Sequence, residues 1–283
     1  MTSLRYLYFP GCKIGPFLPE YDRSTRAVMA ALGVELVDAE LNCCGYPVRE
    51  VDFTAAVFAG ARVLAVASQM SLPLLTPCKC CYGNLMQAKY WMKQSTSLRE
   101  QVVGLLADEG LHWSDEIVVR HLLTALKTDL GLHVLRDAVK QPLQGYPVAV
   151  HYGCHALRPS DVTHFDNPLA PTVFESVVAA TGASAVPWPL RLECCGRPLW
   201  EKNNDLALSL MRRKVSDAIE SGAKAMITAC TYCQLQFGSG RMEHLAAQTS
   251  YRELPSILVS QLLGTALGLS GETLGKKGFP DLG

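Results

Sequence analysis

Ten of the eleven cysteines in this 283-residue chain fall into two sets with the same arrangement. Each set contains a cysteine that stands alone, an adjacent pair followed by glycine, and a Cys-x-x-Cys pair. The first set is Cys12, Cys43, Cys44, Cys78 and Cys81, and the second set is Cys154, Cys194, Cys195, Cys230 and Cys233. Thiolates are ligands for soft metals, so this repeated pattern indicates two metal sites.

Five thiols in each set suit an iron–sulfur cluster better than a zinc ion. A structural zinc site takes four ligands, usually from two Cys-x-x-Cys pairs, whereas each set here has only one such pair. Adjacent cysteines point in divergent directions and rarely form a disulfide with each other, but both can reach a cluster that contains several metal atoms. Zinc binding, disulfides and unreactive core thiols remain open as alternatives.

Cys80 is the eleventh cysteine, and Tyr232 occupies the equivalent position in the second set. The Cys-x-x-Cys spacing of the second set favours Cys78 and Cys81 as the ligands of the first, which leaves Cys80 as a free thiol. An exchange of roles between Cys80 and one of its neighbours is the alternative.

Two histidines, His151 and His155, flank Cys154. A histidine beside a metal centre can donate a hydrogen bond to sulfur or carry a proton near neutral pH. We expect His155 to be the catalytic side chain, because it follows the cysteine on the loop side, although a histidine bonded only to backbone is the ordinary case. Basic side chains near the cysteines could bind an anionic substrate or tune a metal centre, with solvated surface as their default role: Lys13, Arg49, Lys79, Arg158 and Arg197.

The elements that must position the cysteines repeat as well. The apolar pattern predicts strands at equivalent places in the two halves, at residues 6–9, 34–37, 148–152, 184–186 and 225–228, and a strand is also expected before the Cys-x-x-Cys pair of the first half. Helical periodicity separates the strands, most clearly over 206–221, and Gly33 and Gly182 suit the left-handed position that closes a helix. We therefore predict an α/β fold of two tandem, similar, small parallel-sheet domains, with the cysteine loops at the carboxyl ends of the strands.

We predict a first domain over 1–144 and a second over 145–283. Residues from about 84 to 144 have no counterpart of equal length in the second half, and we predict that they form a helical insert. An uncharged stretch near the C-terminus contains Pro255 and several polar residues, so we interpret it as an amphipathic helix over 255–267, buried or facing a partner, rather than a membrane span.

Composition excludes several other functions. Lys and Arg number 26 and Asp and Glu number 26, so the chain lacks the basic surface of a nucleic-acid-binding protein. We find no secretory signal and expect a cytoplasmic protein. The glycine-rich fingerprints of flavin, nicotinamide and phosphate-loop binding are missing, as is a ferredoxin-type cysteine run, so flavin or nicotinamide is not expected on this chain.

The order of single Cys, Cys-Cys-Gly and Cys-x-x-Cys, present twice over nearly the whole chain, resembles the Cys-Cys-Gly (CCG) domain family, and in particular the HdrB subunit of heterodisulfide reductase and its relatives. The resemblance implies that each five-cysteine set binds a non-cubane [4Fe-4S] cluster, with the ten cysteines named above as ligands. It also implies a disulfide oxidoreductase that reduces or forms a disulfide-type bond between its two clusters.

The resemblance implies partners too. Electrons would arrive through a ferredoxin-like subunit and an FAD-containing subunit of the same complex, and the substrate would be a coenzyme disulfide, protein-bound lipoate or another thiol. The alternative is an electron-transfer subunit similar to those of glycolate or lactate oxidases, without a disulfide substrate, although such subunits usually carry a fused ferredoxin-like segment. A zinc-stabilised scaffold without redox activity is a third possibility.

Overall fold

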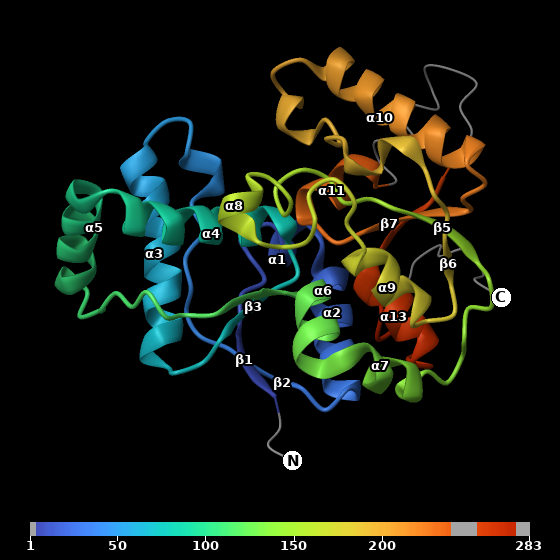
Figure 1. The fold of residues 1–283 in the computed structure, drawn as a ribbon, viewed down its shortest axis with the longest axis horizontal. Coiled ribbons are helices and arrows are strands. Elements are labelled where there is room, and N and C mark those ends of the chain that lie inside the picture. Colours follow the sequence, from blue (N-terminus) through green and yellow to red (C-terminus); the bar gives the residue numbers. More distant parts are fainter. Residues whose placement is uncertain (1–3, 239–253, 276–283) are drawn as a thin grey trace.

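The computed structural model describes residues 4–238 and 254–275, and these contain two four-stranded sheets (Figure 1). The strands of the first sheet are β1 (Arg5–Tyr8), β2 (Glu35–Val37), β3 (Leu74–Thr76) and β4 (Val119–His121). Those of the second are β5 (Pro147–Val150), β6 (Ser184–Ala185), β7 (Ala225–Thr228) and β8 (Ser256–Leu258). Their orders are β2-β1-β3-β4 and β6-β5-β7-β8, and all neighbours are parallel. The predicted α/β fold with two similar parallel sheets is confirmed.

Helices connect the strands and cover the sheets. In the first half they are α1 (Ile14–Phe17), α2 (Pro19–Ala31), α3 (Phe53–Gln69), α4 (Lys79–Gln94), α5 (Thr96–Asp108), α6 (Leu122–Thr124), the π-helical η2 (Ala125–Gly131) and α7 (Leu132–Ala138). In the second half they are α8 (Ser160–Thr163), α9 (Val173–Ala179), α10 (Asn204–Glu220), α11 (Thr231–Phe237) and α13 (Val259–Ala266). Short 3₁₀ turns are η1 (Tyr46–Val48), η3 (Pro189–Leu192) and η4 (Arg197–Leu199).

The central strands are apolar because helices cover both of their faces. All residues of β3 and of β7 are buried, which is the pattern of parallel strands packed between helical layers. In each sheet the chain moves from its first strand to one side and then crosses to the other, so the strand order reverses between β1 and β3 and between β5 and β7. Crevices for ligands form at the carboxyl ends of strands at such a reversal.

Two short strands were not predicted. The insert of residues 84–144 is not purely helical, because β4 adds a fourth strand to the first sheet beside β3. Likewise the stretch predicted as a single helix over 255–267 begins with strand β8, and α13 follows it. Three-residue strands carry too few residues for a periodicity of two to be visible, and each is defined by pairing with a distant strand.

The two halves share one hydrophobic core. Helix α13 packs on α2, where the Ser24 and Ser260 hydroxyls lie 2.7 Å apart, so its apolar side is buried and not presented to a partner. Figure 1 shows α2, from the first half, beside α13. One cluster of buried apolar side chains includes Leu75 from β3 and Ile227 from β7. The domain limits 1–144 and 145–283 stay a prediction.

Among the described residues, no helix combines the length and apolar character that crossing a bilayer requires.

Candidate metal centre

The fold brings the ends of four central strands together, and a cysteine follows each one. Cys12 follows β1 and Cys78 follows β3, on the two sides of the reversal in strand order. Cys154 and Cys230 follow β5 and β7 in the same way. Loops at the carboxyl ends of parallel strands converge, so cysteines far apart in the sequence become neighbours.

The glycine of each Cys-Cys-Gly motif shapes the turn that presents the paired cysteines. Gly45 and Gly196 have φ of 89° and 86°, in the left-handed region that glycine tolerates best. A Cβ on Gly45 would overlap the carbonyl oxygen of Ala56 at the start of α3, and one on Gly196 would lie 2.9 Å from the Ala207 carbonyl oxygen in α10. Glycine is therefore required both for the backbone conformation and for the close approach of a helix.

Each set of five cysteines surrounds its own cavity. The first-set cavity is lined by all five cysteines of the first set, and the second-set cavity by Cys154, Cys194, Cys195, Cys230 and Cys233. In the first set, the sulfurs of Cys12 and Cys43 are 3.3 Å apart. The structure thus gathers the predicted ligands into two groups. Their binding of a metal stays a prediction.

The two cavities adjoin each other. The Sγ of Cys230 lies 3.9 Å from that of Cys78 and 3.4 Å from that of Cys80, so sulfurs of the two sets are in contact. Cys80, Tyr46 and Tyr232 line both cavities, and the two tyrosine rings lie 5.2 Å apart. These distances bring the two cysteine sets face to face. Cys80, expected to be a free thiol, lies at their junction.

His155 lies at this junction as well. Its Nδ1 is 3.3 Å from the Sγ of Cys80 and 3.5 Å from that of Cys154, and its Nε2 is 3.3 Å from a guanidinium nitrogen of Arg49. Burial, and then the charge of Arg49, lower the pKa of His155 below its usual value. The side chain is therefore neutral near pH 7 and is placed to exchange a proton with the thiols. Its catalytic role stays a prediction.

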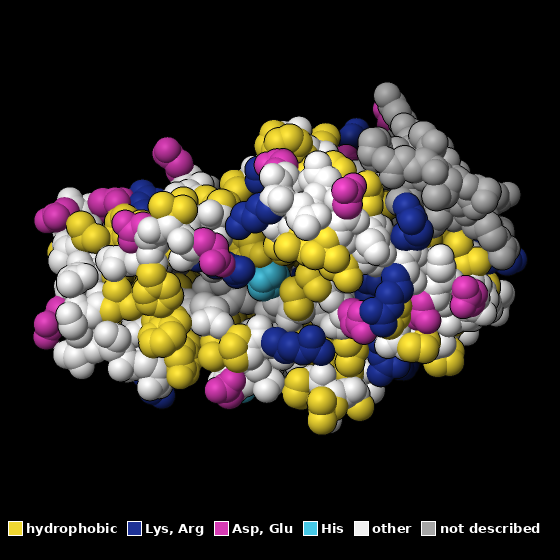
Figure 2. Space-filling model, turned by 90° about the horizontal axis from the view of Figure 1, so that it is seen from above, with side chains coloured by type: hydrophobic (Ala, Val, Ile, Leu, Met, Phe, Trp, Pro, Cys, Tyr) yellow, Lys and Arg dark blue, Asp and Glu magenta, His cyan; other side chains and the backbone are white. Residues whose placement is uncertain are grey.

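A third and larger cavity, about 350 Å³, begins at His155. Arg49 and Arg158 supply positive charge to its wall, and Phe53 and Trp91 supply aromatic surface. Figure 2, which views the molecule from above, shows a histidine side chain near the centre of the face with Lys and Arg side chains on both sides. The cavity is a route from solvent toward His155.

The first cysteine of each Cys-Cys-Gly motif has a pKa below the usual value of a thiol. Interaction with the Cys12 thiol, then with Cys44, lowers the pKa of Cys43 to about 3. In the second set, interaction with Cys154, then with Cys195, lowers the pKa of Cys194 to about 2, and the Gly196 N–H donates to its sulfur at 3.4 Å. Deprotonated thiols are the form that binds metal, so both sets are prepared for it.

The five basic residues predicted near the cysteines lie in different surroundings. Lys79 was expected at the surface and is buried instead, with its Nζ donating to the carbonyl oxygen of His151 at 3.1 Å. Burial lowers the pKa of Lys79 to about 8, so it remains mostly charged at neutral pH. Arg197 lies over the ring of Tyr232 at 5.8 Å. Lys13 lines the first-set cavity, and Arg49 and Arg158 line the third cavity.

His121 is a site residue that the sequence pattern did not reveal. Its Nε2 lies 3.0 Å from the carbonyl oxygen of Pro77 and 3.1 Å from that of Ala229, the residues that immediately precede Cys78 and Cys230. The side chain therefore ties a cysteine loop of one half to the equivalent loop of the other. It sits at the end of β4, and no sequence signal marked that strand.

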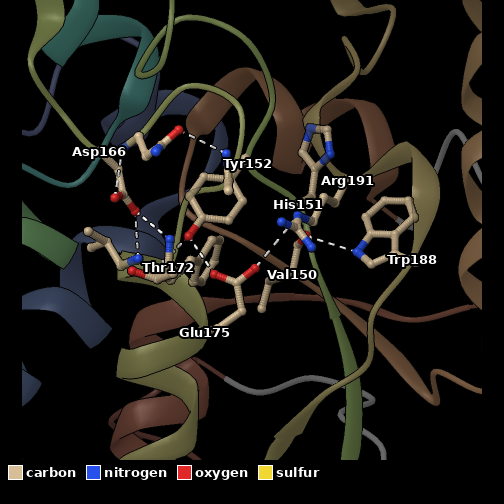
Figure 3. A network of polar contacts seen from close by, with 12 residues as sticks. Val150, His151, Tyr152, Asp166, Thr172, Glu175, Trp188 and Arg191 are labelled. Carbon is tan, nitrogen blue, oxygen red and sulfur yellow. Dashed lines mark hydrogen bonds and ion pairs between the residues drawn. The ribbon is translucent and has the colours of Figure 1, made fainter. Parts of the chain in front are cut away.

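A polar network braces the end of β5, where the loop of Cys154 begins (Figure 3). The hydroxyl of Tyr152 donates to Glu175 at 2.5 Å and accepts from the backbone N–H of Phe174 at 2.8 Å. The indole N–H of Trp188 donates to the carbonyl oxygen of Val150 at 3.1 Å. These bonds hold the residues before Cys154 against α9 and the loop around η3.

The donor chemistry of the site fits iron–sulfur clusters. Among the described residues that line the first-set and second-set cavities there are eleven thiols and no carboxylate, and thiolates are the ligands that hold such clusters. A ring nitrogen of His151 also lies within 4.8 Å of the sulfurs of Cys195 and Cys233, an arrangement that could hold a single ion such as zinc. The metal itself therefore has to be identified by elemental measurement.

Comparisons with known proteins agree with this geometry. The model of the CCG cysteine-rich domain matches residues 6–86 and 148–238. The chain is 34% identical over 272 residues to the 8-methylmenaquinol:fumarate reductase membrane anchor subunit of Wolinella succinogenes, covering 95% of this chain and 94% of the relative. It is 29% identical over 272 residues to the HdrB subunit of the ferredoxin/F420H2-dependent CoB-CoM heterodisulfide reductase of Methanosarcina acetivorans, covering 94% of this chain and 90% of the relative.

Among solved structures, a hypothetical protein from Helicobacter pylori superposes with a TM-score of 0.73 at 16% identity. The match covers 96% of this chain but spans only 50% of the other chain. At this identity the likeness concerns the fold alone.

Proposed function

Since the chain belongs to the cysteine-rich CCG domain family and is related to the HdrB subunit of heterodisulfide reductase, we propose that it is the iron–sulfur subunit that reduces or forms a disulfide-type bond in a larger complex. The observation that carries this proposal is the contact between the two cysteine sets, whose sulfurs approach to 3.9 Å at Cys78 and Cys230. Because the two cavities adjoin, one small disulfide at their junction would be within reach of both sites.

In this proposal each cavity holds one non-cubane [4Fe-4S] cluster, bound by the five cysteines that line it. When bound, such clusters supply one electron each and coordinate the thiolates that a cleaved disulfide releases. Cys80 is assigned no cluster, because the spacing of the second set favours Cys78 and Cys81 as the ligands of the first.

The side chains around the cavities then have separate tasks. His155 is placed to hold or deliver a proton beside the thiols, through its Nδ1. Arg49 is paired with Glu50 at 3.0 Å, so Arg158 leaves the third cavity with a net positive charge that favours an anionic substrate, and its aromatic wall suits an aliphatic or aromatic chain. His121 keeps the loops before Cys78 and Cys230 at a fixed separation.

We propose that electrons reach the chain from a ferredoxin-like subunit and an FAD-containing subunit in the cytoplasm. The support is the missing flavin, nicotinamide and ferredoxin motifs, together with a relative that is named a ferredoxin-dependent heterodisulfide reductase subunit.

A second candidate is an electron-transfer subunit without a disulfide substrate. It is favoured by the relative that is 34% identical, whose name places it in a fumarate reductase. In that case the two sites would pass electrons onward, and the third cavity would have no reacting substrate.

Metal analysis followed by spectroscopy tests the proposal. Anaerobically purified chain should contain iron and acid-labile sulfide in amounts too large for one cubane, and adding a disulfide to the reduced protein should change its electron paramagnetic resonance (EPR) spectrum. Stoichiometric zinc with little iron would refute both functions. Iron with a spectrum that no disulfide alters, in the presence of active electron donors, would support the electron-transfer candidate.

A further inference from the structure

The two cysteine sets have the same ligand pattern but different surroundings. His151 and Phe9 occupy equivalent positions, each three residues before the lone cysteine of its half. Lys79 and Thr231 are equivalent in the same way, each directly after the first cysteine of the Cys-x-x-Cys pair. The duplication therefore provides an internal comparison between the two sites.

His151 points unpaired polar atoms toward the second set. The side chain is 1% exposed, and neither ring nitrogen has a hydrogen-bond partner within the described part of the chain. One of these nitrogens lies within 4.8 Å of the sulfurs of Cys195 and Cys233. Figure 3 shows the ring without any dashed contact. A neutral imidazole has one N–H, and a thiol sulfur can accept a hydrogen bond.

Two buried lysines also adjoin the second set. Lys79 reaches across from the first half, donates to the backbone at His151 and lies over the ring of Phe174 at 4.3 Å. Lys214 is equally buried, donates to the carbonyl oxygen of Leu190 and lies 4.8 Å from the ring of Trp188. Lys79 lines the second-set cavity. Burial lowers the pKa of both lysines, and cysteines of the second set, Cys233 first for Lys79 and Cys195 first for Lys214, oppose this lowering.

The first set lacks this environment. Lys13, which follows Cys12 and lines the first-set cavity, is half-exposed and lies over the ring of Phe17 at 5.0 Å, so water screens its charge. His121 adjoins Cys78, but both of its ring nitrogens are engaged by backbone groups, so no N–H remains for a sulfur. Phe9, in the place of His151, has no polar group at all.

We propose that the two sites differ in reduction potential and that the second site, surrounded by His151, Lys79 and Lys214, accepts an electron before the first. Hydrogen bonds to the sulfurs and nearby positive charge stabilise the reduced and more negative state of a cluster, and so raise its potential. Electrons entering the chain then collect in the second half. This inference rests on the proposed function, since it requires clusters in both cavities.

Solvent exposure favours a higher reduction potential at the first site, but the effect is small. Water stabilises added negative charge, and Cys12 is exposed whereas Cys154 is half-buried. The remaining cysteines match in burial, because Cys43 is half-buried like Cys194, and the other three of each set are buried. The difference in exposure concerns one thiol of five, while the second set has two buried lysines and an imidazole with unpaired ring nitrogens beside it.

The experiment is a redox titration of the anaerobic full chain, followed by EPR. Signals are assigned to a site with Cys44→Ser and Cys195→Ser, which damage the first and second site respectively. His151→Phe places in the second half the residue that the first half has, and Lys214→Met removes a charge. We expect either change to lower the potential of the second site only, shifting the electron distribution between the sites by tenfold or more, about 59 mV for a one-electron couple.

The reverse exchange and a surface change complete the test. Phe9→His should raise the potential of the first site, and Lys202→Met, which removes an exposed lysine of the second half, should leave both unchanged. If His151→Phe does not fold, Lys214→Met and Phe9→His show whether the surrounding side chains set the potentials of the two sites. Equal potentials in the unaltered chain, or substitutions that shift neither or both sites, overturn this inference alone. A chain without iron overturns the proposed function as well.

Discussion

Replacing Gly45 by alanine tests why the paired cysteines are followed by glycine. The residue has φ of 89°, and a Cβ there meets the carbonyl oxygen of Ala56, which belongs to the first turn of α3. Backbone in a helix moves less readily than the end of a flexible side chain. The substitution therefore introduces both conformational strain and a steric overlap directly beside Cys44.

The magnitude follows from these two costs. A non-glycine residue in the left-handed region costs about 1–2 kcal/mol, and forcing extra volume into a packed site costs about 1–3 kcal/mol. Alanine also restricts the unfolded chain, which offsets about 0.4–1 kcal/mol. The free energy of unfolding should fall by about 2–4 kcal/mol, a large share of the roughly 5–15 kcal/mol that stabilises ordinary proteins.

Gly33 provides the matched control. It closes α2 with φ of 73°, and no atom lies within 4 Å of the position that a Cβ would take. Gly33→Ala should therefore cost only about 1 kcal/mol, from strain alone. Urea unfolding of both variants and of the unaltered chain gives the comparison.

Iron content adds a local measurement. Gly45→Ala should lose the first cluster and keep the second, because the overlap displaces only the turn that carries Cys43 and Cys44, whereas Gly33→Ala should keep both. If Gly45→Ala were no more destabilising than Gly33→Ala and retained all its iron, the steric explanation of the motif would be wrong.

Three further outcomes are expected. Cys44→Ser should remove the first cluster and Cys80→Ser neither, as iron and sulfide analysis will show; cluster loss in Cys80→Ser alone would reverse the ligand assignment. Burial, and then the charge of Lys79, lower the pKa of His121 to about 3, so the unfolded chain takes up a proton near pH 6.5 while the folded chain does not. Stability should therefore fall as the pH drops from 6.5 toward 3, and urea midpoints should fall less steeply in His121→Gln. Tyr152→Phe removes two hydrogen bonds and should cost about 1–3 kcal/mol in thermal unfolding without changing the iron content; an unchanged melting temperature would show that the network does not brace the loop.

Most of the architecture could be predicted because its signals are local. Helix α10 is amphipathic over its length, and its predicted limits of 206–221 differ little from the observed Asn204–Glu220. Strand β7 was predicted at its observed limits, because a run of four apolar or β-branched residues, Ala225–Thr228, lies between the helix-closing Gly222 and Cys230. The repetition of the cysteine pattern then indicated two equivalent units, before any contact was known.

The chain by itself determined which residues gather at the site, since cysteines placed after successive parallel strands must meet at one edge of a sheet. The tertiary structure alone decided what surrounds them. Lys79 was expected at the surface but is buried, because its backbone N–H and its ammonium group both donate to carbonyl oxygens of the other half, at Ala229 and His151. His121 lies between the two cysteine loops because it ends β4, a three-residue strand that is defined by its pairing with β3. Burial and pairing across distant segments leave no local periodicity, so the burial of Lys79 and the position of His121 between the two cysteine loops could not be predicted from the sequence.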